Sequence, residues 1–277
     1  MTKQNRRQFL GKAATGLAAT GVAAESLASE PADSQTNEDD LFQPESDWKE
    51  LMEPPDDGKK CGWFIDTRRC FGCHGCEVAC KAENDVPLGN YIRQTFYQDV
   101  GEYPKVARMF LPMSCQHCED APCLKSCPEQ AIKKGPGGSV VIDYQLCQGH
   151  GNCVQACPYG AIYLDPVADK AVKCHNCYHR LENDLQPACA STCPADAIYF
   201  GDLNDPESPV RKASKAAQDD GVELVQLRVD KNTKPRMWFA GPAPAEIEDR
   251  IPQEGESYGP EAYNIYNWKD NQDSASE

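Results

Sequence analysis

Apolar residues in this chain come in short stretches that polar, Gly- and Pro-containing segments interrupt. Three β-prone stretches, at 133–143, 163–173 and 199–203, predict short strands, and the first two favour small β-hairpins. Residues 209–219 predict a short helix, and residues 222–230 predict a strand. No apolar run reaches the roughly 18 residues of a membrane-spanning helix. We therefore expect no transmembrane segment in the chain.

A short motif repeats directly before each β-prone stretch. The sequences CPEQAI, CPYGAI and CPADAI begin at Cys127, Cys157 and Cys193. Each copy predicts one structural unit, in which a cysteine-bearing loop leads to a short helix with the Cys-Pro pair and then to strands. This is the plan of a bacterial ferredoxin, and it predicts an α+β fold with irregular loops.

Both ends of the chain differ from this central region. Residues 1–28 contain Arg6 and Arg7 before a mildly apolar segment, which resembles a twin-arginine signal peptide. A basic helix on a soluble protein is the alternative for this segment. Residues 29–60 predict an acidic linker, and residues 206–277 predict a C-terminal extension. The signal predicts a periplasmic protein, or one on the outer face of the cytoplasmic membrane and held there through partners.

Composition narrows the possible chemistry. The formal net charge of −15 argues against binding to nucleic acid or to an anionic membrane surface. Sixteen cysteines among 277 residues require either disulfides or bound metal to hold the fold together. Substrates of the twin-arginine route are exported already folded around their cofactors, so a metal protein is compatible with the predicted signal.

Four cysteine sets have the spacing of iron–sulfur ligands. The first follows C-x2-C-x2-C-x3-C, while the second and fourth have longer gaps. The third follows the first pattern, except that His150 stands in the place of the second cysteine. The sets are Cys70, Cys73, Cys76 and Cys80; Cys115, Cys118, Cys123 and Cys127; Cys147, His150, Cys153 and Cys157; and Cys174, Cys177, Cys189 and Cys193. Cys61 remains outside them and is not expected to be a ligand.

Iron–sulfur clusters explain this spacing better than zinc does. Three thiolates two residues apart can bind one cluster from a single loop, and the thiolate three residues later ligates the other cluster of a pair. Zinc sites also use C-x2-C pairs, but they do not use repeated four-ligand runs that end in Cys-Pro. The sequence therefore predicts clusters in couples, each couple built from two distant motifs.

The five histidines all lie in or beside these sets, but only one takes a ligand position. His74, His117 and His175 fall in spacers, where hydrogen bonding or a surface position is expected, and His179 lies just beyond the fourth C-x2-C pair. His150 replaces a ligand, and imidazole can bind the iron of a cluster.

The four sets, in this order and with these gaps, resemble the four-cluster electron-transfer subunit of the dimethyl sulfoxide reductase superfamily. The resemblance extends over about 63–205, and its most specific parts are CQHCEDAPC at 115–123 and KCHNCYHRLENDLQPAC at 173–189. Such subunits serve molybdopterin enzymes that act on nitrate, dimethyl sulfoxide, tetrathionate, thiosulfate, polysulfide and arsenic oxyanions.

This resemblance implies a pairing of ligands and an interleaved fold. A ferredoxin-like domain at about 110–170 would be inserted into a second one, so that residues 61–205 form a double domain with four cubane-type clusters. Three clusters would be [4Fe-4S]. The implied sets are Cys70, Cys73, Cys76 and Cys193; Cys174, Cys177, Cys189 and Cys80; Cys115, Cys118, Cys123 and Cys157; and Cys147, His150, Cys153 and Cys127.

The fourth cluster has three possible forms. In the nitrate reductase branch of the family a tryptophan takes the position of His150, and that cluster contains three irons. A [3Fe-4S] cluster is therefore the first expectation, and a His-ligated [4Fe-4S] cluster is the second. In the third form, His150 is a spacer and another group is the ligand. In either of the first two forms, the cluster would have a comparatively high reduction potential.

The function implied is electron relay without substrate chemistry, since the motifs supply no catalytic acid, base or nucleophile. A molybdopterin catalytic subunit would handle the substrate, and a membrane anchor subunit would exchange electrons with quinone. One alternative is the relay subunit of a membrane-bound hydrogenase. A redox sensor is an alternative of another class, although a sensor would be expected to have a reading domain and no export signal.

Overall fold

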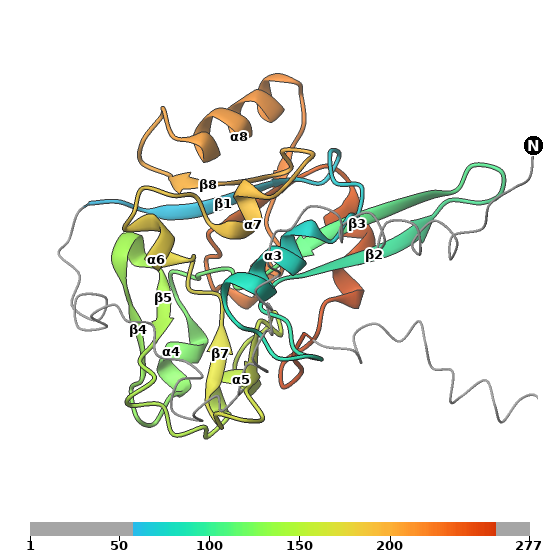
Figure 1. The fold of residues 1–277 in the computed structure, drawn as a ribbon. Coiled ribbons are helices and arrows are strands. Elements are labelled where there is room, and N and C mark those ends of the chain that lie inside the picture. The colour runs from blue at the N-terminus through green and yellow to red at the C-terminus, as the bar shows by residue number, and fades with distance from the viewer. Residues whose placement is uncertain (1–57, 259–277) are drawn as a thin grey trace, which may run out of the picture. The chain divides into compact units, whose positions relative to one another are not determined.

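The computed structural model describes residues 58–258. The predicted signal peptide at 1–28, and the predicted linker apart from residues 58–60, lie outside the described residues. Short helices and small sheets alternate in the described region, so the fold is α+β as predicted (Figure 1). Within residues 58–258, no helix has both the length and the apolar character needed to span a bilayer.

A four-stranded sheet joins segments that are far apart in the sequence. Its order is β8 (Ile198–Asp202), β1 (Cys61–Asp66), β10 (Met237–Ala240) and β9 (Leu224–Val225). Strand β1 is antiparallel to β8, where Trp63 lies opposite Phe200, and parallel to β10, where Trp63 lies opposite Met237. The strand before the first cysteine set is therefore paired with the strand after the fourth set.

Helix α8 (Pro209–Asp219) packs on this sheet and has the bounds that the sequence predicts (Figure 1). Its buried Val210 and Ala217 pack in one apolar cluster with Phe64 of β1 and Ala240 of β10. Proline at the first helical position suits the helix start, because its backbone φ is already helical and its missing N–H would have had no partner there.

The prediction of a strand over 222–230 is wrong for most of its length. Only β9 pairs with β10, and a 3-10 turn, η3 (Val229–Lys231), follows. Arg228 between them has a φ of 48°, which no strand contains. Its guanidinium donates hydrogen bonds of 2.9 Å to the backbone carbonyl oxygens of Ile251 and Pro252. These tertiary contacts, which a local pattern does not encode, accompany the end of the strand.

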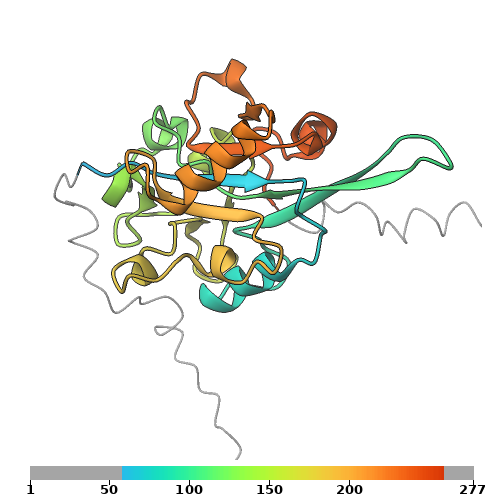
Figure 2. The same ribbon diagram turned by 90° about the horizontal axis from the view of Figure 1, so that it is seen from above.

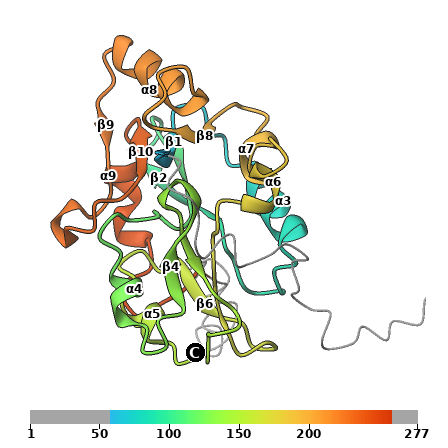
Figure 3. The same ribbon diagram turned by 90° about the vertical axis from the view of Figure 1, so that its left-hand side faces the viewer.

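Two small hairpins lie next to the second and third cysteine sets. Strand β4 (Ile132–Lys134) pairs with β5 (Val140–Ile142), and β6 (Ile162–Leu164) pairs with β7 (Ala171–Lys173), both antiparallel. The turn between β4 and β5 contains η2 (Pro136–Gly138). Figure 3 shows helices α4 (Pro122–Ser126) and α5 (Asn152–Gln155) beside these hairpins. Both hairpins lie where the sequence predicts them.

A second group of short helices joins the first and fourth cysteine sets. Helix α3 (Gly75–Glu83) packs against α7 (Ala188–Ser191). Helix α6 (Tyr178–Leu181) is tied to α3 because His179 and Arg180 both contact Glu83.

A long hairpin, β2 (Gln94–Val100) and β3 (Ala107–Met113), extends away from the other elements (Figures 1 and 2). Helix α9 (Ala243–Ile247), which η4 (Glu248–Arg250) follows, contacts both of its strands. The buried Tyr258 packs edge-on against Phe96 of β2, with 5.6 Å between ring centroids. Residues 206–258, expected as an extension, therefore contribute strands and core side chains to the central fold.

Candidate metal centres

Four cavities collect the predicted ligands. Each cavity is lined by four of them. Site I is lined by Cys70, Cys73, Cys76 and Cys193; site II by Cys80, Cys174, Cys177 and Cys189; site III by Cys115, Cys118, Cys123 and Cys157; and site IV by Cys127, Cys147, His150 and Cys153. Within residues 58–258, no three His, Cys, Asp or Glu side chains lie close enough together to hold a single metal ion.

Each site takes three residues from one set and the fourth from another. The first and fourth sets exchange Cys80 and Cys193, while the second and third exchange Cys127 and Cys157. The structure thus brings together the groupings that the family resemblance implies. Pairing of β1 with β8 and packing of α3 on α7 position the first exchange, since these elements adjoin the two sets.

The repeated C-P-x-x-A-I motif forms one recurring turn. Its fourth residue has a left-handed backbone in every copy, with a φ of 50° at Gln130, 59° at Gly160 and 45° at Asp196. This turn points the N–H of the following alanine at the cysteine sulfur, at 3.3 Å from Ala131 to Cys127 Sγ. The third copy makes the same bond, at 3.3 Å from Ala197 to Cys193 Sγ. Such hydrogen bonds favour a sulfur that carries negative charge.

The C-x2-C loops have a similar local design. His117 N–H and Asn176 N–H each donate to the sulfur two residues earlier, at 3.4 Å to Cys115 Sγ and Cys174 Sγ. In the third set, Gly149 has a φ of 69°, and a Cβ there would lie 2.2 Å from the carbonyl oxygen of Asp169. Glycine is thus required at this position both by the backbone conformation and by the close approach of another segment.

Burial makes several thiols of these sites weaker acids than a free cysteine in the absence of metal. It raises the pKa of Cys76 and Cys174 to about 12 and that of Cys157 to about 11, and it is the largest cause in each case. These thiols are protonated at neutral pH. Because metal ligation needs thiolates, binding of iron must release their protons.

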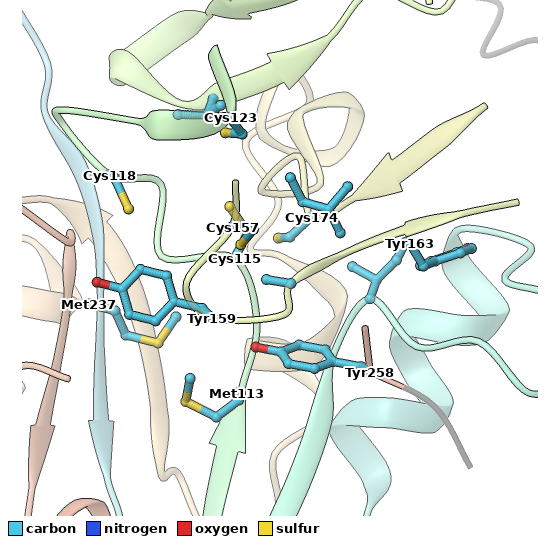
Figure 4. Packing of buried hydrophobic residues seen from close by; sticks show 14 of the residues in the cluster. Met113, Cys115, Cys118, Cys123, Cys157, Tyr159, Tyr163, Cys174, Met237 and Tyr258 are labelled. Carbon is cyan, nitrogen blue, oxygen red and sulfur yellow. The ribbon is translucent and has the colours of Figure 1, made fainter. Parts of the chain in front are cut away.

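Site III shows how the protein encloses such a site. Figure 4 shows Cys115, Cys118, Cys123 and Cys157 around one space, with the rings of Tyr159 and Tyr258 nearby. The Tyr159 hydroxyl is hydrogen-bonded to Thr233 Oγ1 at 2.7 Å, so its polar end is satisfied inside the core. Both tyrosines are 1% exposed, and they therefore keep water away from this side of the cysteine group.

His150 lies in site IV with Cys127, Cys147 and Cys153, but its surroundings differ from those of the thiols. Its side chain is 46% exposed, and its Nε2 lies 3.2 Å from Oε1 of Glu129, which is equally exposed. Glu129 is the third residue of the first C-P-x-x-A-I copy and also lines site IV. A carboxylate on Nε2 would leave Nδ1 as the nitrogen that can face a metal.

The other four histidines use a ring nitrogen in hydrogen bonds within the protein. Nδ1 of His117 accepts from Val140 N–H at 3.0 Å. The partners of the remaining three are side chains: Glu77 for His74, Asn84 for His175 and Glu83 for His179. Cys61 on β1 lines none of the four sites; its side chain lies against Gly137, where a Cβ would approach its sulfur to 2.3 Å.

Sequence reasoning missed the polar residues that surround the cysteines. Arg93 and Asn176 line site II, and Thr95 lines site I with its hydroxyl 3.7 Å from Cys76 Sγ. Trp63 Nε1 donates to Asn176 Oδ1 at 3.0 Å, which fixes the loop that carries Cys174. Only Asn176 lies inside a motif, so no spacing signal could have identified Arg93 or Thr95.

The residues present fit an iron–sulfur cluster at each site. The donor sets are thiols, with one imidazole in site IV, and backbone N–H groups point at several of the sulfurs. Within residues 58–258 no three of these donors are close enough together to bind a single metal ion, whereas a cluster is larger and is ligated at several irons.

Comparison with known proteins agrees with this fit. Residues 106–203 match the family described as a 4Fe-4S dicluster domain. The B subunit of tetrathionate reductase from Salmonella typhimurium is 37% identical over 181 residues, which cover 64% of this chain and 71% of that protein. The B component of polysulfide reductase from Wolinella succinogenes is 39% identical over 186 residues, which cover 65% of this chain and 94% of that protein. The B component of anaerobic dimethyl sulfoxide reductase from Escherichia coli is 36% identical over 152 residues, which cover 52% of this chain and 74% of that protein.

These relatives are all components of reductases. The chain is accordingly a redox subunit that transfers electrons and does not itself carry substrate chemistry. It belongs to the iron–sulfur electron-transfer subunits of the molybdopterin oxidoreductases of the dimethyl sulfoxide reductase superfamily.

Proposed function

We propose that this subunit relays electrons over four iron–sulfur clusters, between a membrane anchor subunit that reacts with quinone and a molybdopterin catalytic subunit. The observation that carries the proposal is the collection of all sixteen predicted ligands into four separate cavities of four. The clusters would supply one-electron transfer, for which a polypeptide alone has no suitable group. The protein would hold them, exclude water and set their potentials.

In this proposal sites I, II and III each bind [4Fe-4S], and site IV binds either [3Fe-4S] or a His-ligated [4Fe-4S] cluster. The sites form two ferredoxin-like halves, with the residues of about 110–170 inserted into the outer half. The cysteine exchange supports this division, since sites I and II share one pair of sets and sites III and IV share the other.

The substrate of the complex would be a sulfoxide or an oxyanion of sulfur, nitrogen or arsenic. Support comes from the relatives, which are named for tetrathionate, polysulfide and dimethyl sulfoxide. The test is purification of the complex from its source, followed by iron and sulfide analysis and identification of the large subunit. A molybdopterin protein with four clusters in this subunit is the expected result. A nickel hydrogenase partner, or a chain that lacks clusters, would contradict the proposal.

Export by the twin-arginine route is part of the same proposal and rests on Arg6 and Arg7. Changing both residues to lysine keeps the charge and removes the paired guanidinium groups. The variant should accumulate in the cytoplasm, while the unchanged protein should fractionate with the periplasm or with the outer face of the cytoplasmic membrane. Export of the double variant would contradict the signal assignment without affecting the relay.

A further inference from the structure

Arg93 is a buried cation that has no acidic partner. The residue precedes β2 and is 2% exposed, although its guanidinium is always charged. Nη2 donates to the hydroxyl of Ser114 at 3.2 Å, and Nη1 has no hydrogen-bond partner. The guanidinium lies over the ring of Trp63, 5.1 Å from its centroid. Within residues 58–258, Arg93 forms no ion pair.

A fully buried charge is very costly unless an opposite charge compensates it. The buried Glu77 of α3 forms no ion pair with Arg93; its carboxylate contacts His74 and accepts a hydrogen bond from the backbone N–H of Thr95. Neutral groups are therefore the direct partners of Arg93, and its counter-charge must come from another source.

The position of Arg93 identifies that source. Arg93 lines site II together with Cys80, Cys174 and Cys189, while Thr95, two residues further on, lines site I. Burial is the largest single influence and lowers the pKa of Arg93, but the thiolate forms of Cys189, Cys76, Cys174 and Cys80 together outweigh it and raise the pKa. The segment from Arg93 to Thr95 thus runs from site II to site I, and three of these thiolates belong to site II and one to site I.

We propose that Arg93 is the shared counter-charge of the clusters in sites I and II, and that it raises the reduction potentials of both. This inference rests on the proposed function, since it requires clusters in these two sites. A cluster that gains one electron becomes more negative by one charge. A nearby fixed cation stabilises this reduced form more than the oxidised form, and in a buried site little water screens the interaction.

A buried lysine provides an internal comparison. Lys173 is 2% exposed, and its ammonium donates to backbone carbonyls, including that of Cys174 at 2.6 Å. Its charge lowers the pKa of Cys174 in site II and of Cys123 in site III, although burial raises both pKa values overall. Lys173 is thus near sites II and III, whereas Arg93 is near sites I and II.

The experiment is a dithionite titration with redox mediators, followed by electron paramagnetic resonance, on the purified complex with all clusters bound. Arg93→Met should move two of the four reduction steps to lower potential, each by at least a tenfold change in the equilibrium constant, or about 59 mV for one electron. Arg93→Lys should keep both steps near their original potentials. Arg108→Met is the control, because Arg108 is exposed and paired with Asp99.

Each outcome decides between the possibilities. Loss of half of the iron in Arg93→Met, with full iron in Arg93→Lys, would also support a counter-charge role. Loss of iron in both variants would show that the shape of the guanidinium is needed, and this result would overturn the proposal. Unchanged reduction potentials in Arg93→Met would also overturn it. If the unchanged complex holds no clusters in this subunit, the proposed function fails instead.

Discussion

Site II and site IV each take three residues from one cysteine set and the fourth from another, yet their surroundings are opposite. Site II has two buried cations next to it, Arg93 and Lys173, each 2% exposed. Site IV has a half-exposed imidazole, His150, whose neighbour is the carboxylate of Glu129. The two sites are assembled in the same way, so the imidazole ligand and the differences in charge and exposure are what would give clusters bound there different potentials.

The largest effect that tests this comparison should come from removing a buried ligand of site II. Cys189 is 5% exposed, and Cys189→Ser replaces a thiolate by a poorer donor that stays protonated. Loss of groups around a metal ligand already costs about 10–100-fold in affinity or activity, and loss of the ligand itself should cost more. We expect the site II cluster to be absent and electron transfer through the complex to stop, as measured by iron content and substrate reduction with a quinol donor.

Cys61→Ser is the control for this variant, since Cys61 lines none of the four sites. It should retain full iron and full turnover. Equal losses in the two variants would mean that general destabilisation, and not a missing ligand, explains the result for Cys189→Ser.

At site IV, His150→Cys should restore an all-cysteine cluster of lower potential. A thiolate adds negative charge where imidazole has none, so the reduction step of this cluster should fall by at least about 59 mV. If the original cluster has three irons, the iron content should also rise and the resonance signal of the oxidised state should disappear. His74→Cys in the spacer of site I should change neither quantity. An unchanged potential in His150→Cys would show that His150 is not at the iron.

A substitution that strains the backbone of the site IV loop should have a smaller effect, which should appear as a loss of stability. Gly149→Ala places a Cβ 2.2 Å from the carbonyl oxygen of Asp169 at a φ of 69°. Gly221→Ala meets the same kind of backbone, with a φ of 78°, but has open space around the new Cβ. The left-handed backbone costs about 1–2 kcal/mol in each variant, and the close contact adds to this only at Gly149. The temperature of cluster loss, followed by visible absorbance, should therefore fall further for Gly149→Ala, and equal shifts would contradict the contact.

The four ligand sets and the exchange of one ligand within a pair of sets were predictable from spacing, which is a local property of the chain, whereas the pairing of particular sets was implied by the family resemblance. The motif C-P-x-x-A-I predicted both hairpins after Cys127 and Cys157, and the structure adds the reason for its alanine, whose N–H faces the sulfur. Helix α8 was predictable because one face of a short helix is apolar. The prediction of a strand around Arg228 was wrong, because hydrogen bonds to a distant segment accompany a different backbone conformation there, and a local pattern does not contain such contacts.

The charges around the sites could not be predicted for a related reason. Arg93 lies between the first two cysteine sets in a segment without a motif, and only the fold brings it to site II and over the ring of Trp63. Lys173 directly precedes Cys174, but only the fold shows that its ammonium is buried and bonded to carbonyls. Charge pairing depends on tertiary contacts between distant segments, and a single sequence does not contain that information in its spacing.

The smallest expected effect concerns Glu129, whose contact with His150 also became visible only in the structure. Both side chains are 46% exposed, and ion pairs in such positions contribute about 0–1 kcal/mol. Glu129→Gln keeps an oxygen acceptor for Nε2 of His150 and removes one negative charge near site IV. The potential of the site IV cluster should therefore rise, but by less than His150→Cys lowers it. Because the Debye length is only about 3 Å in 1 M salt, a titration at that ionic strength should abolish the difference between Glu129→Gln and the unchanged protein. A difference that persists in 1 M salt would mean that Glu129 acts by orienting the imidazole ring at the metal, and the surroundings of site IV would then be less solvated than its exposure indicates.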